Sequence, residues 1–424
     1  MKVDVHLPSG DSCSVTVLAK SPISELKAAA QQHFQRRLKL TAKGQQLDLT
    51  ATMNKAGLRD GDVVAAVLQL GQLAATDQAF ALHGHGADMA TWGRPEYGGD
   101  ISQVQEQLRN AQHMQATAGA FAATLDSGAV VTWGSPEDGG DSSQVQEQLR
   151  NVQHIQSTSV FFGAAFAAIL ESGAVVTWGG LDCGGDSSQV QEQLRKVQHI
   201  QATDGAFAAI LQSGACVTWG HPDFGGDSSH VQEKLRNVQH IQSTSVSFGA
   251  AFAAILEFGA VVTWGSPGYG GDSSQVQEQP RRVQHIQATD GAFAAILESG
   301  AAVTWGDPAA GGDSNQVQEQ LRKVQHIQAT GGAFAAVLES GAVVSWGDPE
   351  SGGDSNQVQR RQQPGARAAA ECSASPSNWR KQLRKVQHIR ATGGAFAAIR
   401  ESGAVVTWGD PAAGGDSSQV QEQL

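Results

Sequence analysis

The tripeptide Thr/Ser-Trp-Gly recurs eight times, and this recurrence limits the possible folds more than any other feature of the chain. The eight tryptophans are Trp92, Trp133, Trp178, Trp219, Trp264, Trp305, Trp346 and Trp408, at spacings of 41, 45, 41, 45, 41, 41 and 62 residues. A module of this length, built from a few short strands, cannot bury both faces of its sheet by itself, so neighbouring modules must stack. The sequence therefore predicts an array of eight repeats, numbered here 1 to 8 in chain order.

The departures from the 41-residue spacing fall at defined places. Where the spacing is 45, repeats 3 and 5 read QSTSVFFGAAFAAIL (156–170) and QSTSVSFGAAFAAIL (242–256), and repeat 4 reads QATDGAFAAIL. These long repeats lie 86 residues apart, which indicates duplication of a two-repeat block. The spacing of 62 is one repeat plus an insertion at 360–380. We expect a disordered loop there, with an arginine-rich docking segment and a gene-model artefact as alternatives.

A typical repeat contains three strand-like runs, VQHIQ, AFAAIL and AVVTWG, with a Glu-Ser-Gly hairpin turn between the second and third. Pro and Gly-Gly after the tryptophan end the third strand. In repeat 2, Asp141-Ser142-Ser143-Gln144 then has the form of a helix capping box, followed by Val145, Leu149 and Val152 at helical spacing. This pattern predicts a short helix per repeat, although Pro280 argues against the helix in repeat 5.

Residues 70–424 resemble the regulator-of-chromosome-condensation repeat family. The resemblance is carried by the Ala/Leu strand at 332–338, the turn glycine Gly341, and Val-Val-Ser-Trp-Gly (343–347) followed by Gly-Gly. Three departures are alanines (Ala335, Ala336) where the family carries a histidine, Gly-Gly-Asp-Ser in place of Gly-Gln-Leu-Gly, and eight motifs where the founding propeller has seven blades. The resemblance implies a mainly β fold, an eight-unit β-propeller of short meanders with seven or eight blades, of which we favour eight.

The first seventy residues predict a separate α+β domain. Runs 2–7 and 12–18 read as two strands around a Pro8-Ser9-Gly10 turn, and Ser21-Pro22 is a helix start. The apolar positions that follow have helical spacing, and later ones alternate as in strands; they are Ile23, Leu26, Ala30 and Phe34, then Leu38 and Leu40, then VVAAVLQL at the end. This β-β-α-β-β order predicts a domain over 1–70, with the repeats over 71–424.

This order resembles the ubiquitin-like β-grasp family, and the most specific piece is Gly57-Leu58 with Asp60-Gly61-Asp62 before the last strand. The chain runs on through Leu70-Gly71-Gln72 without a terminal Gly-Gly, so conjugation in the manner of ubiquitin is excluded. The position that matches ubiquitin's exposed isoleucine is Lys39, near Arg36 and Arg37. These three residues form a candidate basic interaction patch, which differs from the family's apolar docking surface.

The repeated polar and aromatic residues allow both a functional and a structural interpretation. The tryptophans could form a ligand-stacking ring, but we expect them to pack between blades. Seven histidines recur in the first strand, and a metal site would require them to converge; we expect surface positions for His113, His154, His199, His240, His285, His326 and His388. One aspartate follows each Gly-Gly, with helix capping or turn formation expected; these are Asp100, Asp141, Asp186, Asp227, Asp272, Asp313, Asp354 and Asp416. An acidic rim that attracts basic partners is the alternative.

We interpret His83 and His85 as part of a degenerate terminal repeat, with a catalytic pair as the alternative.

Composition removes several classes of function. Residues 1–70 carry nine Lys/Arg against six Asp/Glu, whereas the rest carries 20 against 35. So acidic an array repels phosphate backbones, and we expect no nucleic acid partner. The four cysteines (Cys13, Cys183, Cys216, Cys372) lack disulfide or zinc spacing, which favours a reducing compartment, cytoplasmic or nuclear. We expect no signal peptide, membrane span, cofactor or metal.

No catalytic motif is recognisable: the sequence has no P-loop, nucleophile elbow or HExxH. We therefore expect a monomeric, non-enzymatic scaffold for protein–protein interaction, with protein partners that could include ubiquitin-pathway components. One alternative is a relative or fragment of a HECT-type ubiquitin ligase that carries similar repeats. Another is a guanine-nucleotide exchange factor for a Ran-like GTPase, by analogy with the founder of the repeat family.

Overall fold

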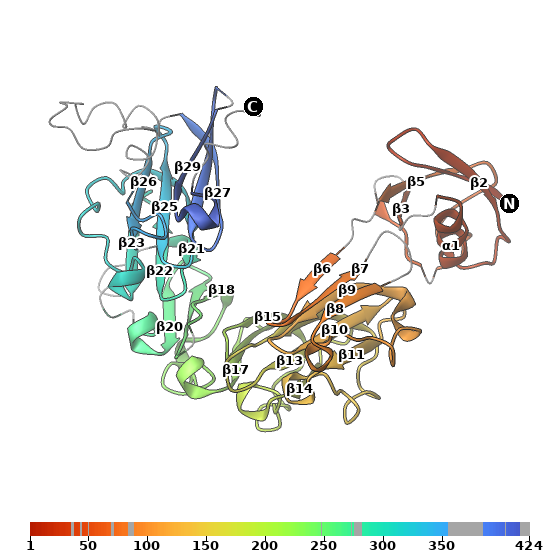
Figure 1. The fold of residues 1–424 in the computed structure, drawn as a ribbon, viewed down its shortest axis with the longest axis horizontal. Helices are drawn as coiled ribbons and strands as arrows, with labels where there is room; N and C mark the ends of the chain where they lie inside the picture. Colours follow the sequence, from red (N-terminus) through yellow and green to blue (C-terminus); the bar gives the residue numbers. More distant parts are fainter. Residues whose placement is uncertain are drawn as a thin grey trace. The chain divides into compact units, whose positions relative to one another are not determined.

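The N-terminal residues form a mixed five-stranded sheet with one helix packed against it (Figure 1). The computed structural model describes residues 1–34, 38–42, 45–49, 51–68, 72–83, 89–246, 248–272, 274, 282–354, 385–402 and 404–415. The insertion predicted at 360–380 and the patch residues Arg36 and Arg37 lie outside these residues. The chain divides into two compact bodies, Met1–Pro136 and Glu137–Leu424, and each is described by itself.

This N-terminal domain, residues 1–70, is called the head, and its strand order is β2-β1-β5-β3-β4, with β1 and β5 parallel and the other pairs antiparallel. Its elements are β1 (Lys2–His6), β2 (Ser12–Thr16), α1 (Ile23–Phe34), β3 (Leu38–Ala42), β4 (Gln45–Gln46) and β5 (Val63–Leu68). Ile23, Leu26 and Ala30 of α1 are fully buried against alternate residues of the strands, such as Val5 and Leu40. This confirms the predicted helix face and the predicted strands and helix in their order, to which the structure adds the two-residue strand β4.

Eight three-stranded antiparallel sheets follow, one for each tryptophan motif. In chain order they are β6 (Gln72–Ala75), β7 (Ala79–His83) and β8 (Met89–Gly93); β9 (Ala111–Ala116), β10 (Ala120–Leu125) and β11 (Val130–Gly134); β12 (Val152–Ser157), β13 (Ala165–Leu170) and β14 (Val175–Gly179); β15 (Val197–Ala202), β16 (Ala206–Leu211) and β17 (Cys216–Gly220); β18 (Val238–Ser243), β19 (Ala251–Leu256) and β20 (Val261–Gly265); β21 (Val283–Ala288), β22 (Ala292–Leu297) and β23 (Ala302–Gly306); β24 (Val324–Ala329), β25 (Ala333–Leu338) and β26 (Val343–Gly347); β27 (Val386–Ala391), β28 (Ala395–Arg400) and β29 (Val405–Gly409). The three strands predicted for each repeat are confirmed.

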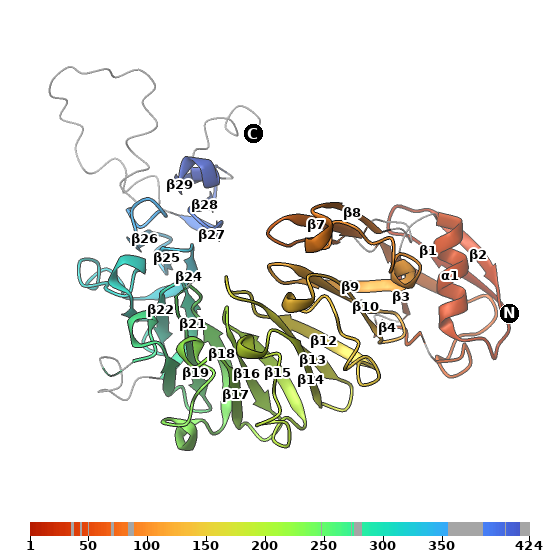
Figure 2. The ribbon, with the colours of Figure 1, turned by 60° about the horizontal axis from the view of Figure 1, so that its bottom comes forward.

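The middle strand of each sheet in the second body shows why the repeats stack. In β16 the residues Ala206, Phe207, Ala208 and Ala209 are all fully buried, so both faces of the strand are covered. Alanine on both faces allows neighbouring sheets to approach closely. Figure 2 shows the sheets of Glu137–Leu424 following one another along a curved row. A single sheet could not bury these residues, as the repeat length predicted.

The short helix predicted after each Gly-Gly-Asp is wrong in repeats 1 to 4 and 6, where the whole segment is described, and Pro280 lies outside the described residues. These segments form turns or a single turn of 3-10 helix, such as Gln232–Lys234. In repeat 3, Ser187 Oγ donates to Gln191 Oε1 at 2.8 Å, and Gln191 Nε2 donates to the carbonyl oxygen of Val175 at 3.0 Å. The side chain of Gln191, two residues after the glutamine of the predicted capping box, thus ties the segment to the third strand. The tertiary bond replaces the continuing helix.

Candidate interaction surface

A joint between successive repeats recurs seven times, and the tryptophans form its centre. Each indole Nε1 donates to the carbonyl oxygen of a glycine in the preceding repeat, at 3.0–3.2 Å. The pairs are Trp133–Gly98, Trp178–Gly139, Trp219–Gly184, Trp264–Gly225, Trp305–Gly270, Trp346–Gly311 and Trp408–Gly352. These seven side chains are buried, which is the packing position expected for them.

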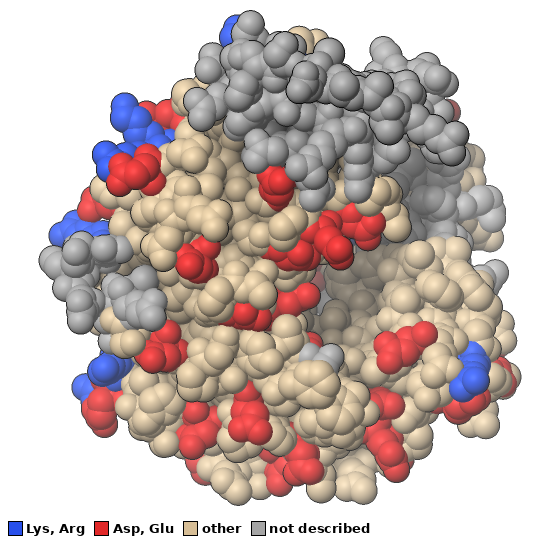
Figure 3. Space-filling model, turned by 60° about the vertical axis from the view of Figure 1, so that its left-hand side comes forward, with Lys and Arg blue, Asp and Glu red and all other residues tan. Residues whose placement is uncertain are grey.

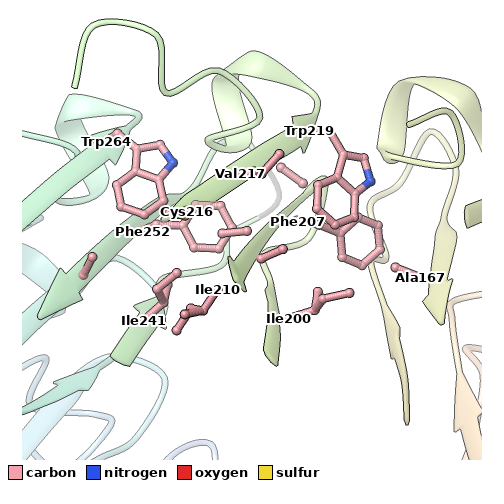
Figure 4. Packing of buried hydrophobic residues seen from close by; sticks show 14 of the residues in the cluster. Ala167, Ile200, Phe207, Ile210, Cys216, Val217, Trp219, Ile241, Phe252 and Trp264 are labelled. Carbon is pink, nitrogen blue, oxygen red and sulfur yellow. The ribbon is translucent and has the colours of Figure 1, made fainter. Parts of the chain in front are cut away.

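Repeat 5 shows the joint in detail (Figure 4). The Trp264 indole stacks on the Phe252 ring of the same sheet, with ring centroids 5.2 Å apart. Gly225 of the preceding repeat has φ +92° and lies so close to Phe252 that a Cβ there would be 2.6 Å from the ring. Only glycine accommodates both the positive φ and the close contact. The first glycine of the pair after the tryptophan is thus a packing surface for the next repeat, here and at Gly98, Gly139, Gly184, Gly270, Gly311 and Gly352.

Repeat 1 differs, because no repeat precedes it. Its Phe80–Trp92 stack has the same geometry, with centroids 5.3 Å apart, but Trp92 is 47% exposed and Phe80 is 43% exposed. In the last repeat, Gly414 has φ +99° and open space where a Cβ would point. Trp92 is therefore the one motif tryptophan that the described residues leave uncovered.

The histidines of the first strands are exposed or half-buried, as expected, and some lie near one another. The rings of His285 and His326 are 6.5 Å apart. Burial lowers the pKa of His199 and of His285, and neighbouring histidines lower both further. Among the described residues, no three His, Cys, Asp or Glu side chains are grouped as metal ligands.

The aspartates after Gly-Gly form turns. In repeat 3, Asp186 Oδ1 accepts a hydrogen bond from the Ser188 backbone N–H at 2.8 Å, and this bond lowers the pKa of Asp186. The same bond forms at Asp100, Asp141, Asp227, Asp272 and Asp313. Asp416 lies outside the described residues. The turn-forming role therefore holds for these six aspartates.

Each sheet has two different ends. We call the end with the Asp/Glu/Gln-Ser-Gly or Glu-Phe-Gly turn between the second and third strands the turn end. The opposite end, the loop end, carries the loop between the first and second strands and the loop after the tryptophan. In the second body, backbone hydrogen bonds join the loop ends of neighbouring repeats: Ser159 N–H donates to the Asp204 carbonyl oxygen at 2.7 Å, and Ser245 N–H to that of Asp290 at 2.8 Å.

The four extra residues of repeats 3 and 5 produce exposed aromatic loops at this loop end. The aromatic loops are residues 159–163 and 245–249, of which Ser247 lies outside the described residues. Phe161 is 76% exposed and Phe248 is 80% exposed, and their ring centroids are 6.1 Å apart. The two loops thus meet, although they are one repeat apart. Phe162 is less exposed because it packs on the His221 ring, with centroids 5.5 Å apart.

Aspartates alternate with the aromatic loops along the loop end. Repeats 3 and 5 carry the aromatic loops, and repeats 4 and 6 carry Asp204 and Asp290 at the shorter loops. Ser245 Oγ donates to the carboxylate of Asp204, which ties this aspartate to the second aromatic loop. Burial raises the pKa of Asp204 and of Asp290, and the charge of Asp204 raises that of Asp290 further. Among the described residues, no lysine or arginine forms an ion pair with either carboxylate.

Most of the described basic side chains of the second body lie elsewhere and form ion pairs. At the turn end, Lys323 pairs with Glu339 at 3.7 Å and Lys385 with Glu401 at 3.3 Å. In the segments after the tryptophan loops, arginines pair with glutamates three residues before them, as Arg322 does with Glu319 at 2.5 Å. In Figure 3, Asp and Glu side chains are spread over the face shown, and Lys and Arg side chains lie toward its margins.

The predicted basic patch of the head is only partly described. Lys39 is exposed in β3, opposite Val67 of β5, and Arg36 and Arg37 lie outside the described residues. A different head lysine makes a contact that the sequence did not predict: Lys27 of α1 is buried, and its Nζ lies 3.4 Å from Asp126 Oδ1 in the turn after β10. The first body therefore contains a direct ion pair between head and repeat.

The described cysteine side chains are free thiols in buried positions. Burial raises the pKa of Cys216 to about 12, and burial first and then the charges of Asp182 and Asp138 raise that of Cys183 to about 11. Both remain protonated at neutral pH and are poor nucleophiles. No helix within the described residues is both long and apolar enough to cross a lipid bilayer.

Sequence reasoning located the insertions in repeats 3 and 5 but did not identify their phenylalanines as surface residues. The available signal was the presence of phenylalanine in a segment that is Ala-Thr-Asp-Gly or Ala-Thr-Gly-Gly in repeats 4, 6, 7 and 8. Large apolar residues in a loop without a partner strand have no neighbour to bury them.

Comparisons with known proteins give a structural likeness for a part of the chain. No protein-family model matches the chain, and no curated protein matches it. A solved structure, the crystal structure of the UBL domain of Plasmodium falciparum Dsk2, is similar at 18% sequence identity and a TM-score of 0.16. The match covers 16% of this chain and 97% of that one.

Proposed function

We propose that this chain is a non-enzymatic scaffold for protein–protein interaction, in which the repeat array presents a binding surface and the ubiquitin-like head links the bound protein to the ubiquitin pathway. The observation that carries the proposal is the exposure of the aromatic loops on an otherwise well-packed array. Exposed large apolar side chains that meet across repeats mark interaction sites on soluble proteins.

The rest of the array supports this role. The tryptophans, the paired glycines and most of the repeated aspartates have structural tasks, which leaves the loop-end insertions as the feature that distinguishes individual repeats. Repeated units held by identical joints form a stiff platform, and variable loops on such a platform provide specificity. The raised pKa values of Cys183 and Cys216 also argue against thiol catalysis by these two residues.

We further infer that the eight sheets are the blades of one closed propeller of the chromosome-condensation-regulator type and that residues 1–70 are a ubiquitin-like domain. The eight sheets and the glycine-tryptophan joints support the first inference. The strand order β2-β1-β5-β3-β4 with α1 supports the second. We expect the protein to be a monomer in the cytoplasm or nucleus, without nucleic acid partners or cofactors.

Affinity capture with purified full-length protein tests the scaffold role. Three baits are compared: the full chain, the full chain with Phe161→Ser and Phe248→Ser, and the full chain with Lys39→Glu. We expect the full chain to retain a defined set of proteins, the double serine variant to lose partners of the array, and K39E to lose ubiquitin-pathway proteins only.

Two results would count against the proposal. A full chain that retains no protein above the level of an unrelated β-propeller would contradict the scaffold role itself. A partner set that is unchanged by K39E would contradict the use of the head as the link to the ubiquitin pathway.

A further inference from the structure

We propose that the aromatic loops and the aspartates between them bind a basic, arginine-bearing segment of a partner protein. This inference rests on the scaffold function proposed above and assigns its binding surface and the chemistry of the partner. The surface consists of Phe161 and Phe162 in repeat 3, Asp204 in repeat 4, Phe248 in repeat 5 and Asp290 in repeat 6.

The aromatic part of this surface is held in place from below. Val160 and Gly163 form a β-bridge across the first aromatic loop, and Val246 and Gly249 form the same bridge across the second. Phe162 packs on His221 and Phe224, with ring centroids 5.5 and 6.2 Å away. The Phe161 ring lies 6.1 Å from that of Phe248 at a tilted angle of 54°. Two exposed π-faces are therefore fixed near each other.

The charges around these rings select a cation. Ser159 and Ser245 of the two loops are hydrogen-bonded to Asp204, the first to its carbonyl oxygen and the second to its carboxylate, and Ser245 N–H is bonded to the Asp290 carbonyl oxygen. The half-buried Asp204 carboxylate and the backbone of Asp290 are thus tied to the aromatic loops themselves. A guanidinium can lie on an aromatic face and donate to a neighbouring carboxylate at the same time. An anionic ligand such as a nucleic acid would meet two unpaired negative charges.

The alternation of aromatic loop and aspartate has a consequence for the length of the partner. The pattern runs through repeats 3, 4, 5 and 6 and comes from two copies of a two-repeat block. A ligand that pairs with both carboxylates presents at least two cationic side chains along one segment. A single free arginine lacks the second cation.

Binding of a fluorescein-labelled oligo-arginine peptide to the full-length protein tests this inference, with fluorescence anisotropy as the readout at about 0.15 M salt. We expect oligo-arginine to bind more tightly than oligo-lysine, because guanidinium stacks on aromatic rings better than ammonium does. We expect oligo-glutamate not to bind. Phe161→Ser with Phe248→Ser, and separately Asp204→Asn with Asp290→Asn, should each weaken oligo-arginine binding by about tenfold or more.

The chain offers matched controls for both changes. Phe258 is 74% exposed and belongs to the same repeat as Phe248, but it lies at the turn end. Phe258→Ser therefore removes a comparable exposed ring that is not part of the proposed binding surface. Glu298→Gln with Glu339→Gln changes the net charge as the double asparagine variant does, also at the turn end. Both controls should leave the affinity within about twofold of wild type, and circular dichroism should show that all variants are folded.

Three outcomes would overturn the inference. The first is equal weakening by loop-end and turn-end variants, which would show diffuse attraction to an acidic protein. The second is no binding of oligo-arginine by the wild-type protein. The third is self-association of the wild type that the phenylalanine variant abolishes, which would make a second copy the occupant. If affinity capture still retains partners that are insensitive to F161S/F248S, this inference fails while the scaffold function stands.

Discussion

Single residues at the joints determine how tightly successive repeats pack. At one such joint, Trp264 stacks on Phe252 and donates a hydrogen bond to the carbonyl oxygen of Gly225. Gly225 itself has a positive φ and contacts the Phe252 ring. A change of one methyl group there meets a ring that is fully buried and cannot move aside.

Gly225→Ala should therefore lower the free energy of unfolding by about 1–3 kcal/mol, since the new Cβ combines overpacking with a disfavoured positive φ. Chemical denaturation of the full chain measures the loss. Gly268→Ala is the matched control, because Gly268 has open space around its Cα in the following repeat, and it should stay within about 0.5 kcal/mol. Equal effects of the two changes would show that the Gly-Gly pair is not a packing surface.

At the scale of elements, the loops at the loop end contain a charge that lowers the stability of the native state. Asp204 is half-buried without a cation and has a raised pKa, whereas Asp186 in the post-tryptophan turn has a lowered one. The native state therefore favours the protonated form of Asp204 and the ionised form of Asp186. Their contributions to stability must depend on pH with opposite signs.

Asp204→Asn should raise the thermal unfolding midpoint at neutral pH. In the wild type the destabilising charge appears as pH rises from the unfolded pKa, about 3.9, through the raised folded pKa. Below the unfolded pKa both states are protonated, and the difference between variant and wild type should vanish. Thermal scans at several pH values measure this, and a gain that persists in strong acid would contradict the assignment to charge.

Asp186→Asn is the opposite case on the same array. The Ser188 N–H stabilises the ionised carboxylate, so this stability is present above the unfolded pKa and is lost as pH falls through the lowered folded pKa. The variant should melt slightly below wild type at neutral pH and equal it in acid. An increase in midpoint at neutral pH would show that the turn does not use the charge.

The element that follows each tryptophan loop shows how tertiary contacts replace a local preference. The capping-box pattern predicts a helix, but the Gln191 side chain bonds to the third strand and the backbone continues in turns. Local spacing can identify apolar positions such as Leu194, which is fully buried, but it cannot specify the partner that a glutamine will find.

At the scale of the whole molecule, the contribution of Trp92 to stability tests the proposed closed propeller. In a closed ring every blade has two neighbours, so Trp92 would be covered as Trp264 is. Trp264→Ala should cost about 3–5 kcal/mol of unfolding free energy, because it empties a buried joint. If the ring is closed in solution, Trp92→Ala should cost a similar amount in chemical denaturation.

An open array gives a different result for the same pair of variants. With Trp92 exposed to about half, as it is among the described residues, its loss should cost less than about 1 kcal/mol. Quenching of Trp92 fluorescence by iodide, measured against a W92F variant, provides an independent readout. Strong quenching together with a small loss of stability would contradict the closed eight-bladed propeller.

The sequence by itself determined the eight sheets, the strands within each, the turn glycines and the element order of the head. These follow from periodicity and from backbone restrictions, which act over a few residues and can be read locally. Only the tertiary structure decided that Gly225 faces Phe252, that Lys27 reaches Asp126, and that Phe161 meets Phe248 across an intervening repeat. These contacts join residues far apart in the chain, and their geometry depends on how neighbouring sheets stack, which no local pattern encodes.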